Sequence, residues 1–165
     1  MSAGVADIET SMDGLVGFGD LPPAVDALLQ RGVAAYRTDK SMADDLFREA
    51  MALDRSVLPT YFCLYKIHCY SGRLNAARIV AEAGLEEAAR QACWPADWRQ
   101  WLDSPLAMSE PGRFALYTLK ALAFIALKSE RFADAEAMLR VLRRQDPTGT
   151  VGWTVIAELA DALSV

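Results

Sequence analysis

The sequence lacks the features that usually assign a chain of this size to an enzyme class or to a membrane. No run of apolar residues approaches the roughly 20 that a helix needs to cross a bilayer, so we expect no membrane span. It contains no glycine-rich phosphate loop, zinc-type cysteine spacing or serine nucleophile motif. We therefore expect no cofactor, no metal and no catalytic residue, and we interpret the chain as a non-enzymatic protein.

Positive charge is also scarce. Lys and Arg number 17 against 22 Asp and Glu, which gives a net charge of -5. A nucleic-acid-binding protein needs a broad cationic face to neutralise phosphates, so we expect no nucleic-acid partner. With 165 residues, of which 53% are hydrophobic, the chain can bury one sizeable core.

Cysteine is rare, and histidine occurs once. Cys63, Cys69 and Cys93 are odd in number and lie within helical patterns, which favours reduced thiols over a disulfide framework. The first residues lack a basic start followed by an apolar stretch, so no secretory signal is expected. These features predict a cytoplasmic location.

One alternative function is a thiol- or metal-dependent enzyme centred on Cys69, His68 and Cys93. At 100° per residue, Cys63 and Cys69 would point about 120° apart on a helix, and His68 and Cys69 about 100° apart. Ligands on one helix need spacings of three or four residues, which disfavours a shared metal. A core or inter-helix position for His68 is therefore favoured over a role as general base.

No segment alternates apolar and polar residues with period two, so we predict an all-α protein without a sheet. Start signals such as Pro22-Pro23 and Ser109-Glu110-Pro111, and the stop signal Gly72, mark helix ends. The predicted helices cover about residues 20–38, 40–53, 58–71, 74–92, 94–102, 109–129, 131–145 and 150–163. In the last helix, Val155, Ile156, Leu159 and Leu163 are predicted to point inward. Residues 1–19 are predicted to form a flexible arm.

A period of 34 residues runs through these helices. Ala43 and Ala77 stand 34 residues apart, while Ala77 and Ala135 stand 58 apart, which is 34 plus an insert of 24. Three further series keep the same registers: Phe47, Ala81 and Leu139; Ala50, Gly84 and Leu142; and Lys40, Leu74 and Phe132. Such a period, with small residues recurring where helices cross, is typical of stacked helical hairpins.

These residues resemble the tetratricopeptide repeat (TPR) family, whose units are helix-turn-helix pairs of 34 residues. The third repeat matches best, through Leu119, Leu122, Ala123, Ala126, Phe132, Ala135, Leu139, Leu142 and Asp146-Pro147. The resemblance implies one domain over residues 20–165, a TPR-like stack of about three antiparallel hairpins. Its repeats would cover about residues 22–56, 57–90 and 114–147, with an insert over 91–111 and a capping helix over 150–163. Arg55 and Tyr65 depart from the family pattern, which has proline and a small residue at those places.

A second resemblance concerns the segments LPPAVDALLQRGVAAYR, CLYKIHCYSGR and PADWRQW. They look like parts of small helical-repeat proteins encoded beside bacterial nitrogen-fixation genes. The resemblance implies an association with nitrogen fixation and no particular chemistry.

The first helix of each hairpin in TPR proteins lines a concave groove. By resemblance, the groove here would be lined by aromatic and basic residues together with one thiol: Tyr36, Arg37, Phe62, Lys66, Cys69, Tyr70, Tyr117, Lys120, Phe124 and Lys128. Rings would bury apolar side chains of a partner, and ammonium groups would meet carboxylates. Alternatively, the lysines are solvated and the rings pack on neighbouring helices or on the arm. We predict an adaptor, chaperone or assembly factor that binds a peptide or helix of another protein, with an acidic segment as the expected partner.

Three tryptophans lie in the insert. Trp94, Trp98 and Trp101 are spaced four and three residues apart, which would put them on one face of a short helix. They could form a docking or homodimer surface, because tryptophan is enriched at interface hot spots. The favoured interpretation is that they seal the gap that the insert opens, since three exposed indoles would promote aggregation.

Overall fold

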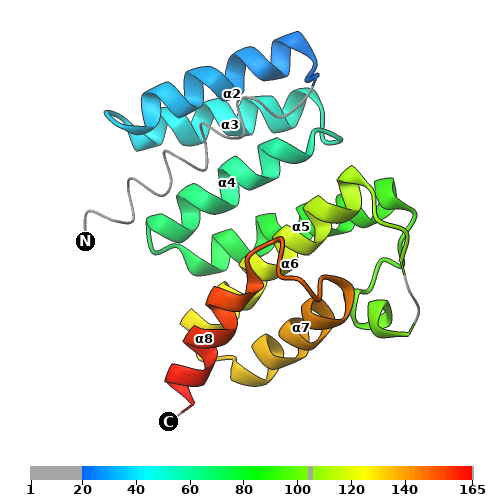
Figure 1. Cartoon of the computed structure of the whole chain (residues 1–165). Coiled ribbons are helices and arrows are strands. Elements are labelled where there is room, and N and C mark those ends of the chain that lie inside the picture. The colour runs from blue at the N-terminus through cyan, green and yellow to red at the C-terminus, as the bar shows by residue number, and fades with distance from the viewer. Residues whose placement is uncertain (1–19, 104–105, 165) are drawn as a thin grey trace. The chain divides into compact units, whose positions relative to one another are not determined.

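The computed structural model describes residues 20–103 and 106–164. The arm predicted over residues 1–19 lies outside the described residues. Within those two ranges the chain forms seven α-helices, one 3-10 helix and no strand, which confirms the all-α prediction (Figure 1). The helices are α2 (Pro23–Tyr36), α3 (Lys40–Leu53), α4 (Leu58–Tyr70), α5 (Leu74–Ala92), η1 (Trp98–Leu102), α6 (Glu110–Lys128), α7 (Phe132–Gln145) and α8 (Trp153–Leu163).

The contacts divide the chain into two compact units, Met1–Ala77 and Arg78–Val165, with the boundary in the first turn of α5. The first unit holds α2 to α4, and the second holds most of α5 together with η1 and α6 to α8. One continuous stack over residues 20–165 stays a prediction. None of the helices in the described ranges has the length and apolarity to cross a membrane.

The 34-residue registers coincide with equivalent places in the helices. Lys40, Leu74 and Phe132 are each the first residue of a helix, and three-residue connections, 37–39, 71–73 and 129–131, precede them. The alanines of the first series, Ala43, Ala77 and Ala135, are completely buried, as are Phe47, Ala81 and Leu139 of the second. The 34-residue repeat of the sequence therefore corresponds to equivalent helix starts and equivalent buried positions in the structure.

Local signals in the first unit place the helix ends. Asp39 caps α3 by accepting a hydrogen bond from the Met42 amide at 3.0 Å. Gly72 follows α4 with a φ of 73°, a conformation that glycine adopts without steric cost. The Arg73 amide then donates back to the His68 carbonyl at 2.9 Å, which satisfies a carbonyl at the helix end. Within this unit α3 packs against both α2 and α4.

The α2–α3 hairpin depends on a close approach between Gly32 and Phe47. A Cβ atom at Gly32 would collide with Phe47 Cε1 and would lie 2.7 Å from Cδ1 of the same ring. Phe47 is fully buried, so the ring cannot move into solvent to make room. The missing side chain at Gly32 therefore sets the spacing of the two helices.

In the second unit α6 and α7 form a hairpin, and α8 packs against both. Ser109 caps α6 by accepting a hydrogen bond from the Gly112 amide at 3.1 Å. After α7, the Asp146 carboxylate accepts hydrogen bonds from the amides of Thr150 and Val151, both at 3.0 Å. These bonds hold residues 150 and 151 outside a helix, so α8 begins at Trp153 and not at residue 150.

The side-chain directions predicted for α8 are wrong in part. Val155 is 65% exposed and Leu163 is 45% exposed, whereas Ile156 and Leu159 are half-buried. The buried residues of α8 are the small ones, Ala157 and Ala160. Small side chains allow α8 to lie close to its neighbours, and this leaves the larger apolar side chains on the outside.

We predict that Gly32→Ala destabilises the protein, because overpacking a full core costs about 1–3 kcal/mol, more than the helix-propensity gain of up to about 1 kcal/mol. Urea unfolding measures the change. In a Phe47→Leu background the same substitution should cost much less, because the smaller side chain leaves room for the new methyl group. Equal costs in the two backgrounds would show that the contact does not set the spacing.

Candidate interaction surfaces

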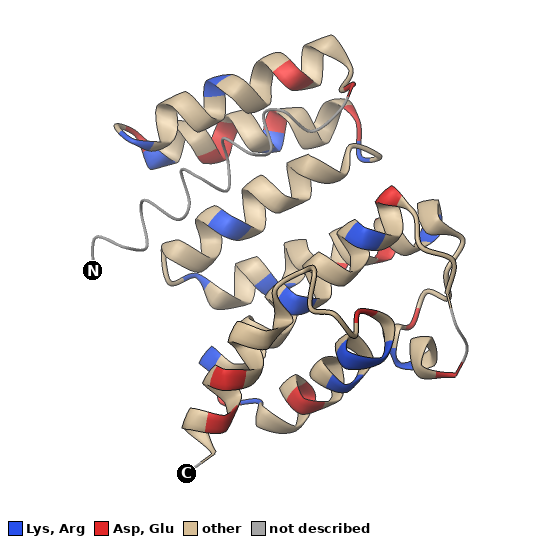
Figure 2. Ribbon diagram, in the orientation of Figure 1, with Lys and Arg blue, Asp and Glu red and all other residues tan. Residues whose placement is uncertain are grey.

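Three predicted lining residues of the first unit that are accessible lie on α4. Lys66 Nζ lies 5.3 Å from the ring centroid of Phe62 and 5.8 Å from that of Tyr70, one turn away on either side. Lys66 is the only Lys, Arg, Asp or Glu on this helix (Figure 2). Tyr70 is 40% exposed, and Lys66 and Cys69 are half-buried. We call Lys66, Cys69 and Tyr70 the α4 surface.

Two other predicted lining residues of this unit are buried. Tyr36 is 4% exposed and Phe62 is 3% exposed, so neither ring is open to a partner. Arg37, the C-cap residue of α2, is exposed. Phe62 instead supports the α4 surface from below, because its ring lies under the Lys66 ammonium and meets the Tyr65 ring edge-on at 5.5 Å.

A second set of lysine–ring pairs lies on α6 in the second unit. Lys120 Nζ lies 3.8 Å from the ring centroid of Tyr117, and Lys128 Nζ lies 5.6 Å from that of Phe124. Lys128 is exposed, and the other three side chains are half-buried. We call Tyr117, Lys120, Phe124 and Lys128 the α6 surface.

Lys120 is the most constrained lysine of the α6 surface. A Cβ atom at Gly152 would lie 3.6 Å from Lys120 Nζ and 3.9 Å from its Cδ, so the side chain extends along the backbone that leads into α8. Lys120 therefore packs between Tyr117 and this turn. Lys128, at the end of the same helix, is the more accessible cation.

Cys63 and Cys69 do not have the electrostatic environment of a nucleophile. Burial raises the pKa of Cys63 to about 12. Burial also raises the pKa of Cys69 to about 11, although the nearby Lys66 ammonium opposes this rise. A reactive cysteine needs a lowered pKa, so both thiols stay protonated near neutral pH. Within the described residues, no three His, Cys, Asp or Glu side chains gather into a group that could hold a metal ion.

His68 is 2% exposed and belongs to the interior of the first unit. Its Nε2 lies 3.9 Å from Asp44 Oδ1, beyond hydrogen-bond distance, and its Nδ1 is buried without a hydrogen-bond partner. Burial lowers the pKa of His68, and the positive charge of Arg73 lowers it further. The Asp44 carboxylate opposes the shift, while Arg48 adds to it weakly. The ring is therefore held neutral.

The tryptophans of the insert are buried and do not form an exposed docking surface. Trp94, Trp98 and Trp101 are 7%, 9% and 0% exposed. The predicted helix through all three is also wrong, because only residues 98–102 are helical, as the 3-10 turn η1. Trp94 precedes this turn and packs on the start of α6, where a Cβ atom at Gly112 would lie 2.6 Å from its Cζ2.

Hydrogen bonds fix the indoles in place. Trp94 Nε1 donates to the Ala107 carbonyl at 3.2 Å, and Trp101 Nε1 donates to the Pro95 carbonyl at 2.8 Å. The two indoles meet edge-on with ring centroids 5.1 Å apart. Gln145 at the end of α7 donates to the Trp101 carbonyl and ties the turn to that helix. The insert is thus packed onto its own unit.

A cavity of about 490 Å³ lies in the second unit, between α5, η1, α6 and α7. Leu85, Leu122 and Met138 supply apolar lining, and two guanidinium groups lie among the lining carboxylates. Arg99 pairs with Asp97 at 3.4 Å and Arg131 with Asp134 at 3.2 Å. The guanidinium charges are therefore neutralised inside the cavity. Sequence reasoning could not find it, since residues from four separate segments line it.

Comparisons with protein-family models, with curated proteins and with solved structures find no match to this chain.

We predict that the neutral state of His68 makes stability depend on pH. Below a pH of about 6.5 the unfolded chain binds a proton at His68, whereas the folded chain, with its lowered pKa, does not. The free energy of unfolding should therefore fall as the pH falls from 7.5 to 5, by at most about 1.4 kcal/mol per pH unit.

Urea unfolding of the wild type and of His68→Gln across this range measures the effect. Because the chain has a single histidine, the variant should lose most of the dependence. An unchanged dependence in His68→Gln would exclude His68 as its cause.

Proposed function

We propose that the chain is a protein-interaction module of TPR-like hairpins that binds acidic segments of a partner on the first helices of its hairpins. The observation that carries this proposal is the recurrence of lysine–ring pairs on α4 and α6. Lys66 lies between Phe62 and Tyr70, and Lys128 lies over Phe124. Both helices occupy the position that lines the binding groove in the TPR family.

The hairpin geometry supports the TPR-like part of the proposal. The first helices end at Tyr36, Tyr70 and Lys128, which keep the register of 34 and 58 residues. Each is followed by a three-residue connection and a second helix whose alanine in the common register is fully buried. A hairpin repeated with such regularity displays the outward side of its first helix in an equivalent way each time.

The chemistry of these surfaces fits an acidic segment that also carries apolar residues. A lysine ammonium held over a ring keeps its charge available, while the ring beside it offers a flat apolar area. A partner carboxylate can meet the ammonium, and an adjacent apolar side chain can cover the ring. Each surface can act alone, so the proposal needs no arrangement of one unit against the other.

An interaction role for the whole chain also fits the raised pKa values of Cys63 and Cys69. A thiol enzyme that used Cys63 or Cys69 as its nucleophile would need that residue as a thiolate. Adaptor, chaperone and assembly factor remain the roles proposed for the module, in a cytoplasmic setting. The association with nitrogen fixation stays a prediction of the sequence resemblance.

We predict that Lys66→Glu and Lys128→Glu together remove acidic-segment binding. Selection from a displayed library of 15-residue peptides should enrich sequences with Asp or Glu beside apolar residues. The double variant should bind the enriched peptides at least about tenfold more weakly, which corresponds to about 1.4 kcal/mol, because both ammonium contacts become repulsive. Fluorescence anisotropy gives the affinities, and each single variant reports on its own surface.

The matched control is Arg31→Glu with Arg140→Glu, which makes the same change in net charge at exposed positions on α2 and α7. This control should keep the wild-type affinity within about twofold. Equal losses in the control and the test variant would assign the effect to net charge and overturn the proposal. Lys120 is left unchanged because it packs against the turn before α8.

A further inference from the structure

The last helix carries an apolar stripe that its own unit leaves open. Val155, Leu159 and Leu163 are spaced four residues apart, and Ile156 lies beside them on the same side of α8. Val155 is 65% exposed and Leu163 45% exposed, while Ile156 and Leu159 are half-buried. An 11-residue helix with a mostly apolar sequence thus turns its larger apolar side chains outward.

This orientation is fixed by contacts on the opposite side of the helix. Ala157 and Ala160 are buried in the unit. Trp153 Nε1 donates to the Asp146 carbonyl at 2.7 Å, and the Asp146 carboxylate holds the turn before α8 through Thr150 and Val151. Rotating α8 to bury the stripe would break these bonds and expose the alanine contacts.

The hairpins of the same chain indicate what kind of element covers such a stripe. Leu28 and Leu29 on α2 are buried, and α3 packs along that helix with Leu46 and Phe47 buried. α3 is amphipathic, because exposed residues such as Arg48 alternate with this buried set.

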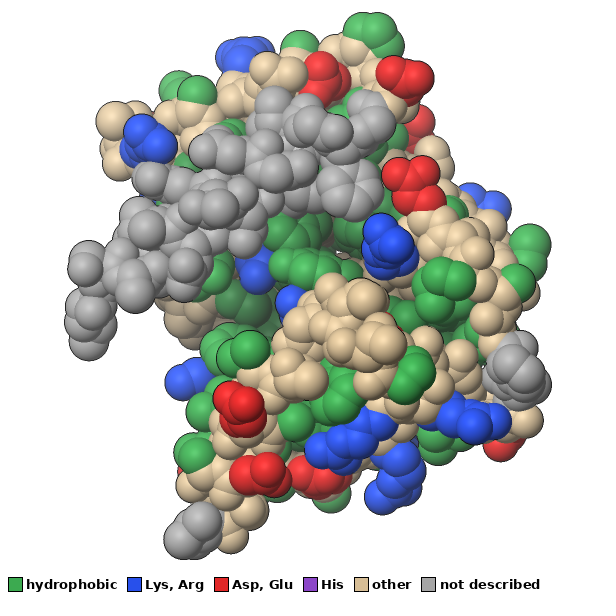
Figure 3. Space-filling view, in the orientation of Figure 1, with side chains coloured by type: hydrophobic (Ala, Val, Ile, Leu, Met, Phe, Trp, Pro, Cys, Tyr) green, Lys and Arg blue, Asp and Glu red, His purple; other side chains and the backbone are tan. Residues whose placement is uncertain are grey.

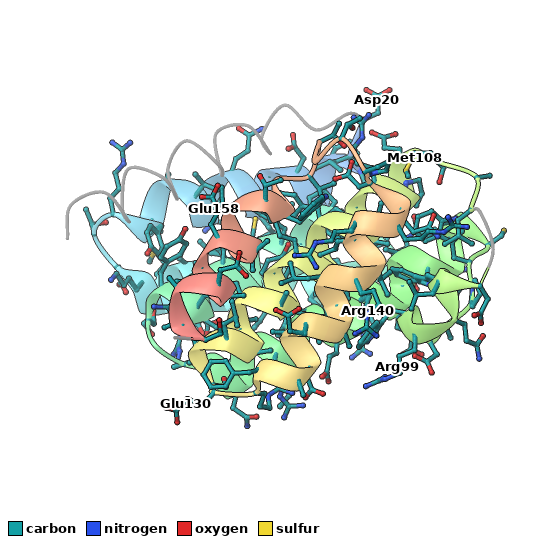
Figure 4. All side chains as sticks on the ribbon, turned by 60° about the horizontal axis from the view of Figure 1, so that its bottom comes forward. Asp20, Arg99, Met108, Glu130, Arg140 and Glu158 are labelled. Carbon is teal, nitrogen blue, oxygen red and sulfur yellow. The ribbon has the colours of Figure 1, made fainter. Side chains whose placement is uncertain are left out.

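The charge beside the stripe narrows the choice of partner. On α8, Glu158 lies beside Val155 at the edge of the stripe, whereas Asp161 lies farther round the helix. The helix has no Lys or Arg (Figure 2). Acidic and hydrophobic side chains lie side by side over α8 in Figure 3, and Figure 4 shows Glu158 on α8 with Arg140 on the neighbouring α7. A second copy of α8 would bring carboxylates of like sign toward each other. A helix with basic flanks would instead pair with them.

We propose that the α8 surface docks an amphipathic helix of another protein, one with leucine-like residues on one face and Lys or Arg beside them. The α8 surface consists of the apolar stripe and the carboxylate at its edge: Val155, Ile156, Glu158, Leu159 and Leu163. The partner helix buries the stripe by the same kind of packing that joins α2 to α3. This binding is separate from that of the α4 and α6 surfaces, which select acidic segments.

The test uses a fluorescein-labelled 18-residue helical peptide with Leu at the apolar heptad positions and Lys on the flanks. A second peptide replaces every Lys with Glu. Anisotropy of the full chain should show binding of the Lys peptide at least tenfold tighter than of the Glu peptide. Val155→Glu with Leu163→Glu should weaken binding of the Lys peptide at least tenfold, and circular dichroism should show unchanged helicity.

Two controls separate the stripe and its flank from general effects. Ile79→Glu changes another exposed apolar residue, on α5, and should leave binding of the Lys peptide unchanged within twofold. Glu158→Lys should weaken it several-fold and favour the Glu peptide, whereas Glu136→Lys, the same charge change on α7, should have little effect. Equal affinity for the two peptides, or equal losses at Ile79 and Val155, would overturn the proposal.

Light scattering tests whether the stripe instead binds a second copy of the chain. A concentration-dependent dimer of the wild type that Val155→Glu with Leu163→Glu abolishes would assign the stripe to a second copy and would also overturn the proposal. A monomer in both cases supports docking of another protein. The variants Lys66→Glu on α4 and Lys128→Glu on α6 should leave binding of the Lys peptide intact. A failure of the α8 docking proposal can therefore be distinguished from a failure of the proposed acidic-segment binding.

Discussion

The close approach of paired helices at small residues is the constraint on which the hairpins depend. At Gly32 the ring of Phe47 occupies the space where a Cβ atom would stand. Ala43, Ala77 and Ala135 are completely buried in the common register. A helix pair that meets at such residues has one spacing and one relative rotation, because a larger side chain or a rotated helix would clash. The small residue Gly32 therefore determines which sides of α2 and α3 face each other.

When one face of a first helix packs against its partner, helical geometry determines which residues lie on the outward face. Residues three and four apart lie on one face, so the spacing along α4 puts Lys66 between Phe62 and Tyr70. Phe62 remains buried and supports the ammonium, while Tyr70 is exposed. A lysine supported in this way loses less conformational freedom when it binds a carboxylate, because part of its stem is already held against a ring. The spacing of residues along α4 thus produces the surface for which we propose binding.

Features that depend on local interactions, such as helix starts, were predicted correctly from the sequence. Features that depend on contacts with residues distant in the sequence were predicted wrongly. The starts of α3 and α6 follow from the capping side chains of Asp39 and Ser109, and both were predicted within one or two residues. The helix through the three tryptophans was wrong, because Trp94 is fixed by Ala107 and Gly112, far along the chain. The inward stripe on α8 was wrong for the same reason. Periodicity shows that a helix has an apolar side, but the neighbouring helices determine which side they cover.

The two kinds of proposed surface carry opposite charge, and this difference bears on the role of the molecule. Lys66 and Lys128 would select acidic segments, whereas Glu158 would select a basic helix. Neither partner would compete for the surface of the other, because each meets like charge there. A chain with two such selectivities can hold two different partners at once, which is what an adaptor or assembly factor must do. A chaperone that holds one client needs only the first surface, so the open stripe of α8 favours the adaptor among the proposed roles.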